Sequence, residues 1–335
     1  MSANSRVTVL GAGSWGTALA LIAAHGGHDV RLWTRDPALA ETINRTRHNP
    51  RLATAELPEN LNANSDLRAA LTKSELVVLA SPSHVLRDLL NSARTLIEPD
   101  ALIVSAAKGI ETASLMRVSE VAAEVLGPGI SSRFVALSGP SFAHEAAAGD
   151  PTAVSAASTD GAAAIAVQDA FSFGNFRLYT NDDVIGTELG GAVKNVVAIA
   201  AGMVRGLGLG HNSVAALITR GLAEIGRLAS QMGGRSETLM GLAGLGDLVL
   251  TCTGDLSRNR HVGVELGRGR KLGDITAEMS EVAEGIRTTA AVHELALKHC
   301  IEMPITAEVF AVLYENKHVP LAAEALMSRP LRSEF

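Results

Sequence analysis

The stretch Arg6–Gly16, RVTVLGAGSWG, decides the fold, because a short apolar run leads directly into three glycines. The run is typical of a buried parallel strand. Gly11, Gly13 and Gly16 have the spacing at which a strand turns tightly, a pyrophosphate approaches the backbone and a helix packs closely. The helix predicted over 14–25 directs its amide dipoles at such an anion. The stretch therefore predicts a dinucleotide-binding unit; the alternative is a glycine-rich turn that only packs a helix on a sheet.

The composition narrows the class of protein. The chain has 335 residues, enough for two domains, and is 47% hydrophobic but only 3% aromatic, which favours a helix-rich α/β enzyme. A formal charge of −6 argues against a general nucleic-acid-binding protein, because no basic domain is present to neutralise phosphates. Cys252 and Cys300 lie far apart without metal-ligand spacing, so we expect reduced thiols and no metal site.

Targeting signals are not expected either. No apolar run approaches the roughly 20 residues of a membrane span. The first residues, MSANSR, lack the apolar region of a signal peptide. The sequence therefore predicts a soluble cytoplasmic protein with no membrane span and no nucleic acid among its partners.

The first half of the chain alternates strands with helices. Further strands are predicted at 29–33, 76–80, 101–105, 134–137, 152–156 and 175–180. This alternation is typical of a doubly wound α/β sheet of the Rossmann type. Beyond residue 185 the patterns are helical, at 183–205, 211–232, 258–268, 282–299 and 305–314. We expect a dinucleotide-binding domain over 1–185 and an all-helical substrate domain over 186–335, with a cleft where they meet.

The end of the second predicted strand bears on the choice of cofactor. An acidic residue about 20 positions past the glycines usually binds the ribose 2′-hydroxyl of NAD, whereas an arginine nearby accommodates the 2′-phosphate of NADP. Asp36 stands at that distance, but Arg35 stands directly beside it. NAD and NADP both stay open, and an ordinary Arg–Asp pair at a solvated turn is the alternative.

Two polar turns follow predicted strands, and in open α/β sheets ligands bind beyond the carboxyl ends of the strands. Lys108 is the penultimate residue of the segment ALIVSAAKG, with Gly109 beside it for a close approach. Ser141 closely follows Gly139 after the next strand, where its hydroxyl caps a helix over 142–148, binds a ligand, or does both. We expect both turns to face the cleft.

The second strong signal is the apolar segment 188–203, ELGGAVKNVVAIAAGM, which is predicted to form a buried helix. Lys194 interrupts it on a face of small residues, and a buried lysine tends to have a lowered pKa that suits acid–base chemistry. The alternative is a lysine whose ammonium reaches water along the domain interface. Asp247 lies in a glycine-rich apolar segment and would need a cationic partner, for which Lys194 is the candidate.

Ser257, Arg258 and Asn259 open a further predicted helix. Free backbone amides and an arginine at a helix start form an anion site that suits a phosphate. Capping by Ser257 beside solvated arginines is the alternative. Glu281 and Glu284 are predicted only to complement the dipole of the next helix.

Taken in order, these segments resemble the bacterial NAD(P)-dependent glycerol-3-phosphate dehydrogenases. The segments GAGSWGTALA, SGPSFA, GGAVKNVVAI, ALITRGLAE, GLAGLGDLVLTCT and SRNR match characteristic blocks of that family, within residues 7 to 315. The resemblance implies a Rossmann domain followed by an all-helical domain. It also implies interconversion of dihydroxyacetone phosphate and sn-glycerol 3-phosphate, which feeds glycerophospholipid synthesis.

The resemblance also assigns roles to single residues. Lys194 matches the catalytic acid–base group. The matched substrate positions are Lys108, Gly139, Ser141, Lys194, Asp247, Ser257, Arg258 and Asn259. Beside Gly11, Gly13 and Gly16 of the first motif, the matched cofactor positions are Ser14, Trp15, Arg35, Lys108, Ala143, Arg258, Val282 and Glu284.

The residue pattern and the resemblance to the family both predict a hydride transfer. Lys194 is expected to donate a proton to the carbonyl oxygen, while the segment 257–259 holds the substrate phosphate. The competing hypotheses are a β-hydroxyacid dehydrogenase and a dinucleotide-sensing regulator, and the sensor would have no use for a buried proton donor. A homodimer is expected by analogy alone.

Overall fold

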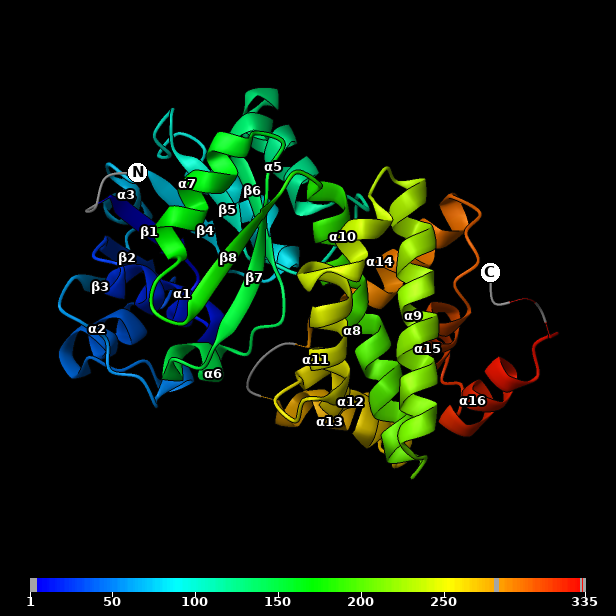
Figure 1. Ribbon diagram of the computed structural model, residues 1–335. Helices are drawn as coiled ribbons and strands as arrows, with labels where there is room; N and C mark the ends of the chain where they lie inside the picture. Colours follow the sequence, from blue (N-terminus) through cyan, green and yellow to red (C-terminus); the bar gives the residue numbers. More distant parts are fainter. Residues whose placement is uncertain (1–4, 280–282, 332, 334–335) are drawn as a thin grey trace.

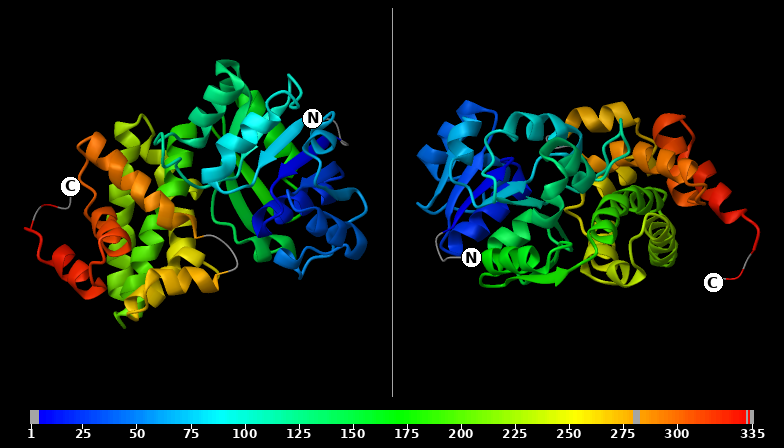
Figure 2. Two further views of the ribbon diagram at one scale, coloured as in Figure 1. Left: turned by 180° about the vertical axis from the view of Figure 1, so that it is seen from behind. Right: turned by 90° about the horizontal axis from the view of Figure 1, so that it is seen from above.

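The computed structural model describes residues 5–279, 283–331 and 333. An N-terminal Rossmann-like α/β domain is followed by a helical C-terminal domain (Figure 1). The two further views in Figure 2 show the helical domain beside the sheet rather than over one of its faces. This arrangement agrees with the fold predicted from the sequence.

Eight strands form one sheet in the order β3-β2-β1-β4-β5-β6-β7-β8. The strands are β1 Arg6–Leu10, β2 Asp29–Trp33, β3 Leu61–Asn64, β4 Leu76–Leu79, β5 Leu102–Ser105, β6 Phe134–Ser138, β7 Thr152–Ala157 and β8 Phe176–Asn181. The first six are parallel, whereas β7 is antiparallel to β6 and parallel to β8. The strand order reverses between β1 and β4, so the point where such sheets bind ligands lies at the carboxyl end of β1.

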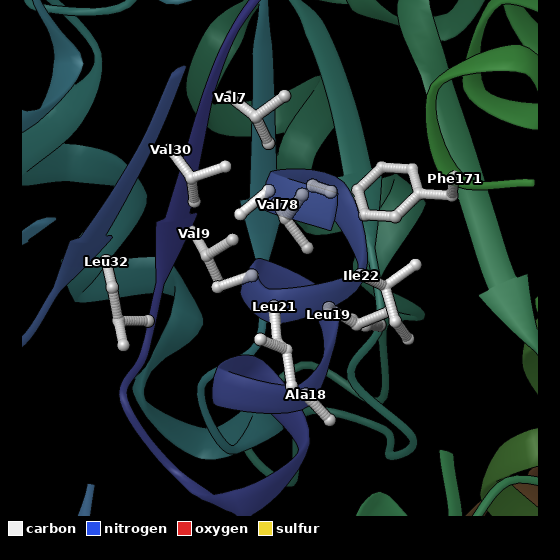
Figure 3. Close-up of a cluster of buried hydrophobic side chains, with 14 of the residues drawn as sticks. Val7, Val9, Ala18, Leu19, Leu21, Ile22, Val30, Leu32, Val78 and Phe171 are labelled. Carbon is white, nitrogen blue, oxygen red and sulfur yellow. The ribbon is translucent and has the colours of Figure 1, made fainter. Parts of the chain in front are cut away.

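Helices cover both faces of the sheet. They are α1 Ser14–His25, α2 Pro37–Thr46, α3 Leu67–Leu71, α4 Leu86–Ala93, α5 Val118–Leu126, α6 Ala143–Ala148 and α7 Gly161–Phe171, with short turns at η1 Pro50–Leu52, η2 Ser83–Val85 and η3 Pro128–Arg133. Helices α1 and α7 share one apolar cluster with the sheet, and α4 and α5 share another. Figure 3 shows Leu19 and Ile22 of α1 beside Phe171 of α7 within the first cluster. These clusters hold the turn after β1 rigidly at the sheet edge.

The helical domain is built around one long helix. Its elements are α8 Val184–Gly206, α9 His211–Gln231, α10 Ser236–Met240, the π-helical turn η4 Leu242–Gly246, α11 Asp247–Thr253, α12 Arg258–Gly267, α13 Leu272–Glu278, α14 Glu284–Lys298, α15 Pro304–Tyr314 and α16 Val319–Met327. α8 packs against α9, α11, α12 and α14, and its N-terminal half also contacts β6 of the sheet (Figure 1). One helix therefore belongs to the cores of both domains.

The apolar character of α8 follows from this position. Of the helices that the structure describes, α8 alone is long and apolar enough to cross a membrane by composition, and 89% of that apolar window is buried inside the protein. No apolar run of this length was expected from the sequence. Burial of α8 among other helices accounts for its apolar composition, as in the core helix of a globular domain.

Helices α8 and α12 cross at very short range because glycines face each other. A Cβ atom on Gly202 would lie 2.8 Å from the Cα of Gly263. A Cβ atom on Gly267 would lie 2.9 Å from the Cα of Gly206. A side chain at any of these positions would push the two helices apart.

Candidate active site

The turn after β1 has the geometry that a dinucleotide needs. Gly11 adopts a φ of +131°, and a Cβ there would lie 2.8 Å from the Ala80 carbonyl oxygen. Gly16 packs α1 onto the turn, since a Cβ there would overlap the Gly11 carbonyl. Gly13 faces open space, and the N-terminus of α1 that it begins has no side-chain cap. The amides at the start of α1 are therefore not covered by a side-chain cap, which is the condition for an anion site at a helix N-terminus.

The two charged residues that follow β2 have different surroundings. Asp36 is the N-cap of α2, and its carboxylate accepts hydrogen bonds from the amides of Ala38 at 3.0 Å and Leu39 at 3.3 Å. Arg35 is exposed beside it. The carboxylate is thus engaged by its own helix. Nearby, the Trp15 ring of α1 packs on Phe176, with ring centroids 6.3 Å apart.

A buried carboxylate joins lysines of the two domains. Asp247, the first residue of α11, is 1% exposed. Its Oδ1 accepts a hydrogen bond from Nζ of Lys194 in α8, and its Oδ2 accepts one from Nζ of Lys108, after β5, at 2.7 Å. Lys194 itself is 5% exposed, which excludes the alternative of an ammonium that reaches water. The predicted pairing of Lys194 with Asp247 is confirmed.

Two hydrogen-bonding residues of this cluster were missed as site residues in the sequence. Lys194 Nζ also donates to Oγ1 of Thr251 at 2.7 Å. Nδ2 of Asn195 donates to the Lys108 carbonyl oxygen at 3.3 Å, and its Oδ1 accepts from Nδ2 of Asn259 at 2.9 Å. A positional signal existed, because Thr251 follows Asp247 by one helical turn.

The surroundings shift the pKa values of the buried pair. Burial lowers the pKa of Lys194 to about 8, although the Asp247 carboxylate opposes that shift. Burial alone would raise the pKa of Asp247, but the ammoniums of Lys108 and Lys194 hold it below its usual value. Near neutral pH the site therefore holds an ionised carboxylate and a lysine that can give up its proton.

The turn after β6 differs from its prediction in one respect. The Gly139 carbonyl oxygen accepts hydrogen bonds from Lys108 Nζ at 3.1 Å and from the Ser141 hydroxyl at 3.0 Å. Helix α6 begins at Ala143, and its N-cap, Phe142, makes no side-chain cap. Of the two alternatives for Ser141, capping of this helix is therefore wrong, because its hydroxyl donates back to the turn. The contact with a ligand stays a prediction.

Gly109 lies against another turn of the chain. A Cβ on Gly109 would lie 2.9 Å from the Cβ of Ser83, which begins η2 after β4. The close approach that this glycine permits is thus between two turns of the chain itself. At the start of α12, by contrast, the hydroxyl of Ser257 accepts a hydrogen bond from the Arg260 amide at 3.2 Å, so its capping role is confirmed.

Glu284 connects the helical domain to the turn after β4. It is the first residue of α14, within the helix start that the sequence predicted, and its Oε1 accepts a hydrogen bond from the Ser83 amide at 2.9 Å. Burial raises the pKa of Glu284, while the positive charges of Arg258 and Lys108 act against that shift. The remaining predicted position, Val282, lies outside the described residues, as does Glu281.

The comparisons with known proteins extend over nearly the whole chain. Residues 6–164 match the family model of the NAD-dependent glycerol-3-phosphate dehydrogenase N-terminus, and residues 183–324 match that of the C-terminus. A glycerol-3-phosphate dehydrogenase [NAD(P)+] of Koribacter versatilis is 53% identical, over 98% of this chain and 99% of the relative. One from Geobacter sulfurreducens is 51% identical, over 99% of each chain.

Solved structures agree with this assignment. The crystal structure of glycerol-3-phosphate dehydrogenase from Coxiella burnetii is 42% identical, with a TM-score of 0.93 over 98% of this chain and 100% of that one. A D-mandelate dehydrogenase is only 12% identical at a TM-score of 0.62, which shows a shared fold alone. The chain belongs to the family of NAD-dependent glycerol-3-phosphate dehydrogenases.

Proposed function

We propose that this protein reduces dihydroxyacetone phosphate to sn-glycerol 3-phosphate with NAD(P)H, in a reversible reaction. One observation carries the proposal. The buried Lys194–Asp247–Lys108 cluster lies where the helical domain meets the carboxyl edge of the sheet. A proton donor is thereby held near the edge of the sheet on which a dinucleotide would lie.

The residues present fit a nicotinamide dinucleotide. The uncapped amides of α1 and the open space at Gly13 suit its pyrophosphate, and the exposed Arg35 suits a 2′-phosphate. When bound, the cofactor supplies the hydride. Further contacts are proposed for Gly11, Ser14, Trp15, Gly16, Lys108, Ala143, Arg258, Val282 and Glu284.

Lys194 acts as the proton donor in this proposal. Negative charge develops on the carbonyl oxygen of the substrate as hydride arrives, and the Lys194 ammonium stabilises that charge and then transfers its proton. Asp247 and Thr251 hold Nζ from two sides, so the amine cannot swing away from the reacting oxygen. A pKa of about 8 leaves the donor charged near neutrality yet acidic enough to react.

The substrate phosphate is assigned to the start of α12. Arg258 and Asn259 lie in its first turn, and Ser257 precedes them. Binding of a phosphate there would use energy from a remote group to align the carbonyl several bonds away. Gly139 and Ser141, on the opposite turn, complete the proposed substrate pocket together with Lys108, Asp247 and Lys194.

The wider assignments rest on the change of sequence pattern near residue 185 and on the resemblance to the family. We propose a dinucleotide-binding domain over 1–185 and a substrate domain over 186–335. We also propose that the enzyme works in the cytoplasm, supplies glycerophospholipid synthesis and forms a homodimer.

The decisive experiment follows NADH or NADPH absorbance after dihydroxyacetone phosphate is added. We expect rapid loss of absorbance, and much slower loss with unphosphorylated dihydroxyacetone. Equal rates with the two ketones would contradict the phosphate assignment. Turnover of a β-keto acid instead would favour a β-hydroxyacid dehydrogenase, and cofactor binding without any turnover would favour a sensor.

A further inference from the structure

Three buried hydroxyl groups meet where the sheet ends against α8. Ser105 is the last residue of β5, Ser138 is the last residue of β6, and Thr187 lies in the first turn of α8. All three side chains are buried, and none of the three hydroxyl oxygens has a hydrogen-bond partner among the described residues. Proteins satisfy about nine in ten such groups, so three together call for a common explanation.

The three residues line one small cavity. Its volume is about 10 Å³, and the other lining residues are Ala107, Lys108, Ala136, Leu137, Glu188 and Gly191. A space of roughly 10–15 Å³ holds one water molecule and no larger ligand. A water buried in a protein typically makes about three hydrogen bonds, which equals the number of hydroxyls offered here.

We propose that this cavity binds a single structural water, which bridges Ser105, Ser138 and Thr187. Each hydroxyl donates to or accepts from this water, so each recovers the hydrogen bond lost on burial. The site is polar and of the right size, the two conditions that distinguish a hydrated cavity from a dry one.

The charges around the cavity favour water over a metal cation. Glu188 is the acidic residue in the lining, and its carboxylate already accepts from Arg117 Nη1 at 2.8 Å and from the Ser119 amide at 2.8 Å. Lys108 lines the same cavity and carries a positive charge. A cation would therefore be repelled by a neighbouring ammonium and would find no free carboxylate in the lining.

The water would join three elements that carry site residues. β5 leads to Lys108, β6 leads to Gly139, and α8 carries Lys194. A shared water between their ends fixes the two sheet turns against the helix. Such a water would be present whichever reaction the enzyme performs, because it joins the ends of the two strands to the helix.

A crystal structure at high resolution tests the proposal directly. We expect one isolated density peak within about 2.7–3.0 Å of all three hydroxyl oxygens. No peak, in a map that shows other buried waters, would overturn the proposal. A peak at about 2.4 Å from its ligands would also overturn it, because that distance indicates a cation.

Substitutions give a second test in solution. Thr187→Val removes the hydroxyl at nearly constant shape, and it should raise the unfolding equilibrium constant about tenfold and lower the occupancy of the water. Thr187→Ser keeps the hydroxyl and is the matched control, with the water retained at full occupancy. Full occupancy in Thr187→Val as well would contradict the bridge.

A double-mutant cycle covers the case in which Thr187→Val fails to fold. Ser105→Ala and Ser138→Ala each remove one hydroxyl of the cavity, and neither hydroxyl has a hydrogen-bond partner among the described residues. If one water bridges the two side chains, the stability lost in the double variant should be smaller than the sum of the two single losses. Additive losses would overturn the shared water.

Discussion

The chemistry of Lys194 depends on what surrounds it. An exposed lysine keeps its proton at neutral pH, but burial lowers the pKa of Lys194 to about 8. Asp247 limits that shift and Thr251 fixes the direction of the amine. A single ammonium is thereby both oriented and made more acidic.

Lys194→Ala should lower kcat by about a hundredfold or more, because general acid catalysis contributes about 10²–10⁴-fold. Binding of NADH or NADPH should survive, since the glycine turn lies on β1 and α1 rather than on α8. Single-turnover kinetics and a cofactor titration measure the two effects. Lys298→Ala, an exposed lysine at the end of α14, is the control. More than about a tenth of the wild-type kcat would exclude Lys194 as the donor.

The pH profile should depend on the direction of the reaction. Reduction needs the charged amine, so its kcat/KM should fall as pH rises through about 8. Oxidation of glycerol 3-phosphate needs the neutral amine, so its kcat/KM should rise over the same range. Stopped-flow rates in both directions measure this. Profiles of the same sign would show that another group governs proton transfer.

Arg35→Ala should weaken NADPH more than NADH, because only NADPH offers a 2′-phosphate to the guanidinium. Asp36→Asn is a useful comparison, since asparagine also caps helices and α2 should remain intact. Steady-state kinetics with each cofactor decide the matter. An equal rise in both KM values would mean that Arg35 contacts the adenosine or only shapes the turn.

At the residue scale, the sequence predicted a contact correctly where a charged side chain stands in an apolar segment. Lys194 and Asp247 are charged groups in apolar segments, so each implied a partner. Ser141 gave no such signal, because serine before a helix is equally compatible with capping and with other hydrogen bonds. The bond between Glu284 and the Ser83 amide spans 201 positions, and nothing local in either segment predicts it.

At the scale of elements, local sequence patterns predicted most of the strands and helices. They did not predict whether a strand runs parallel or antiparallel to its neighbour in the sheet. Every predicted strand is present, with ends that differ by at most one residue. Strand β3, LNAN, was missed because half of its residues are asparagine. The antiparallel course of β7 was not foreseen, since alternation of side chains is the same in either direction.

Helix α15 is capped by a residue of a different helix. Oε1 of Glu224, in α9, accepts from the Ile305 amide at 2.6 Å, and Oε2 accepts from the Thr306 amide at 3.2 Å. Burial raises the pKa of Glu224 from 4.5 to about 6 despite these bonds. Between those values the folded protein holds a proton that the unfolded chain releases. The contribution of Glu224 to stability therefore falls as pH rises from about 4.5 to 6.

Glu224→Gln removes this titration and keeps an acceptor for the Ile305 amide. The stability of the wild type relative to the variant should therefore decrease by roughly 2 kcal/mol between about pH 4.5 and pH 7. Urea unfolding of both proteins at the two pH values measures the change. A difference that stays constant with pH would show that folding does not raise the pKa of Glu224.

At the scale of the whole molecule, α8 makes the two domains interdependent. Its N-terminal half packs on β6 and its C-terminal half crosses α12 at the facing glycines. We expect the domains to unfold together in urea. The two tryptophans, Trp15 and Trp33, both lie in the N-terminal domain, so their fluorescence reports on that domain alone.

Far-ultraviolet circular dichroism is dominated by helices and reports on both domains. The fluorescence and dichroism transitions should coincide at one urea midpoint. Two separated midpoints would mean that the helical domain keeps its structure without the sheet. Gly263→Ala, which forces α8 and α12 apart, should lower the single midpoint for both signals.

The same helix has a consequence for the protein while it is being made. Helix α8 leaves the ribosome before α11, α12 and α14 exist to cover it, and by length and composition it suits a lipid bilayer. Lys194 stands near the midpoint of α8, where a charge opposes insertion by about 2.5–3.5 kcal/mol. The lysine that we propose as the proton donor would therefore also oppose insertion of the unfinished chain into a membrane.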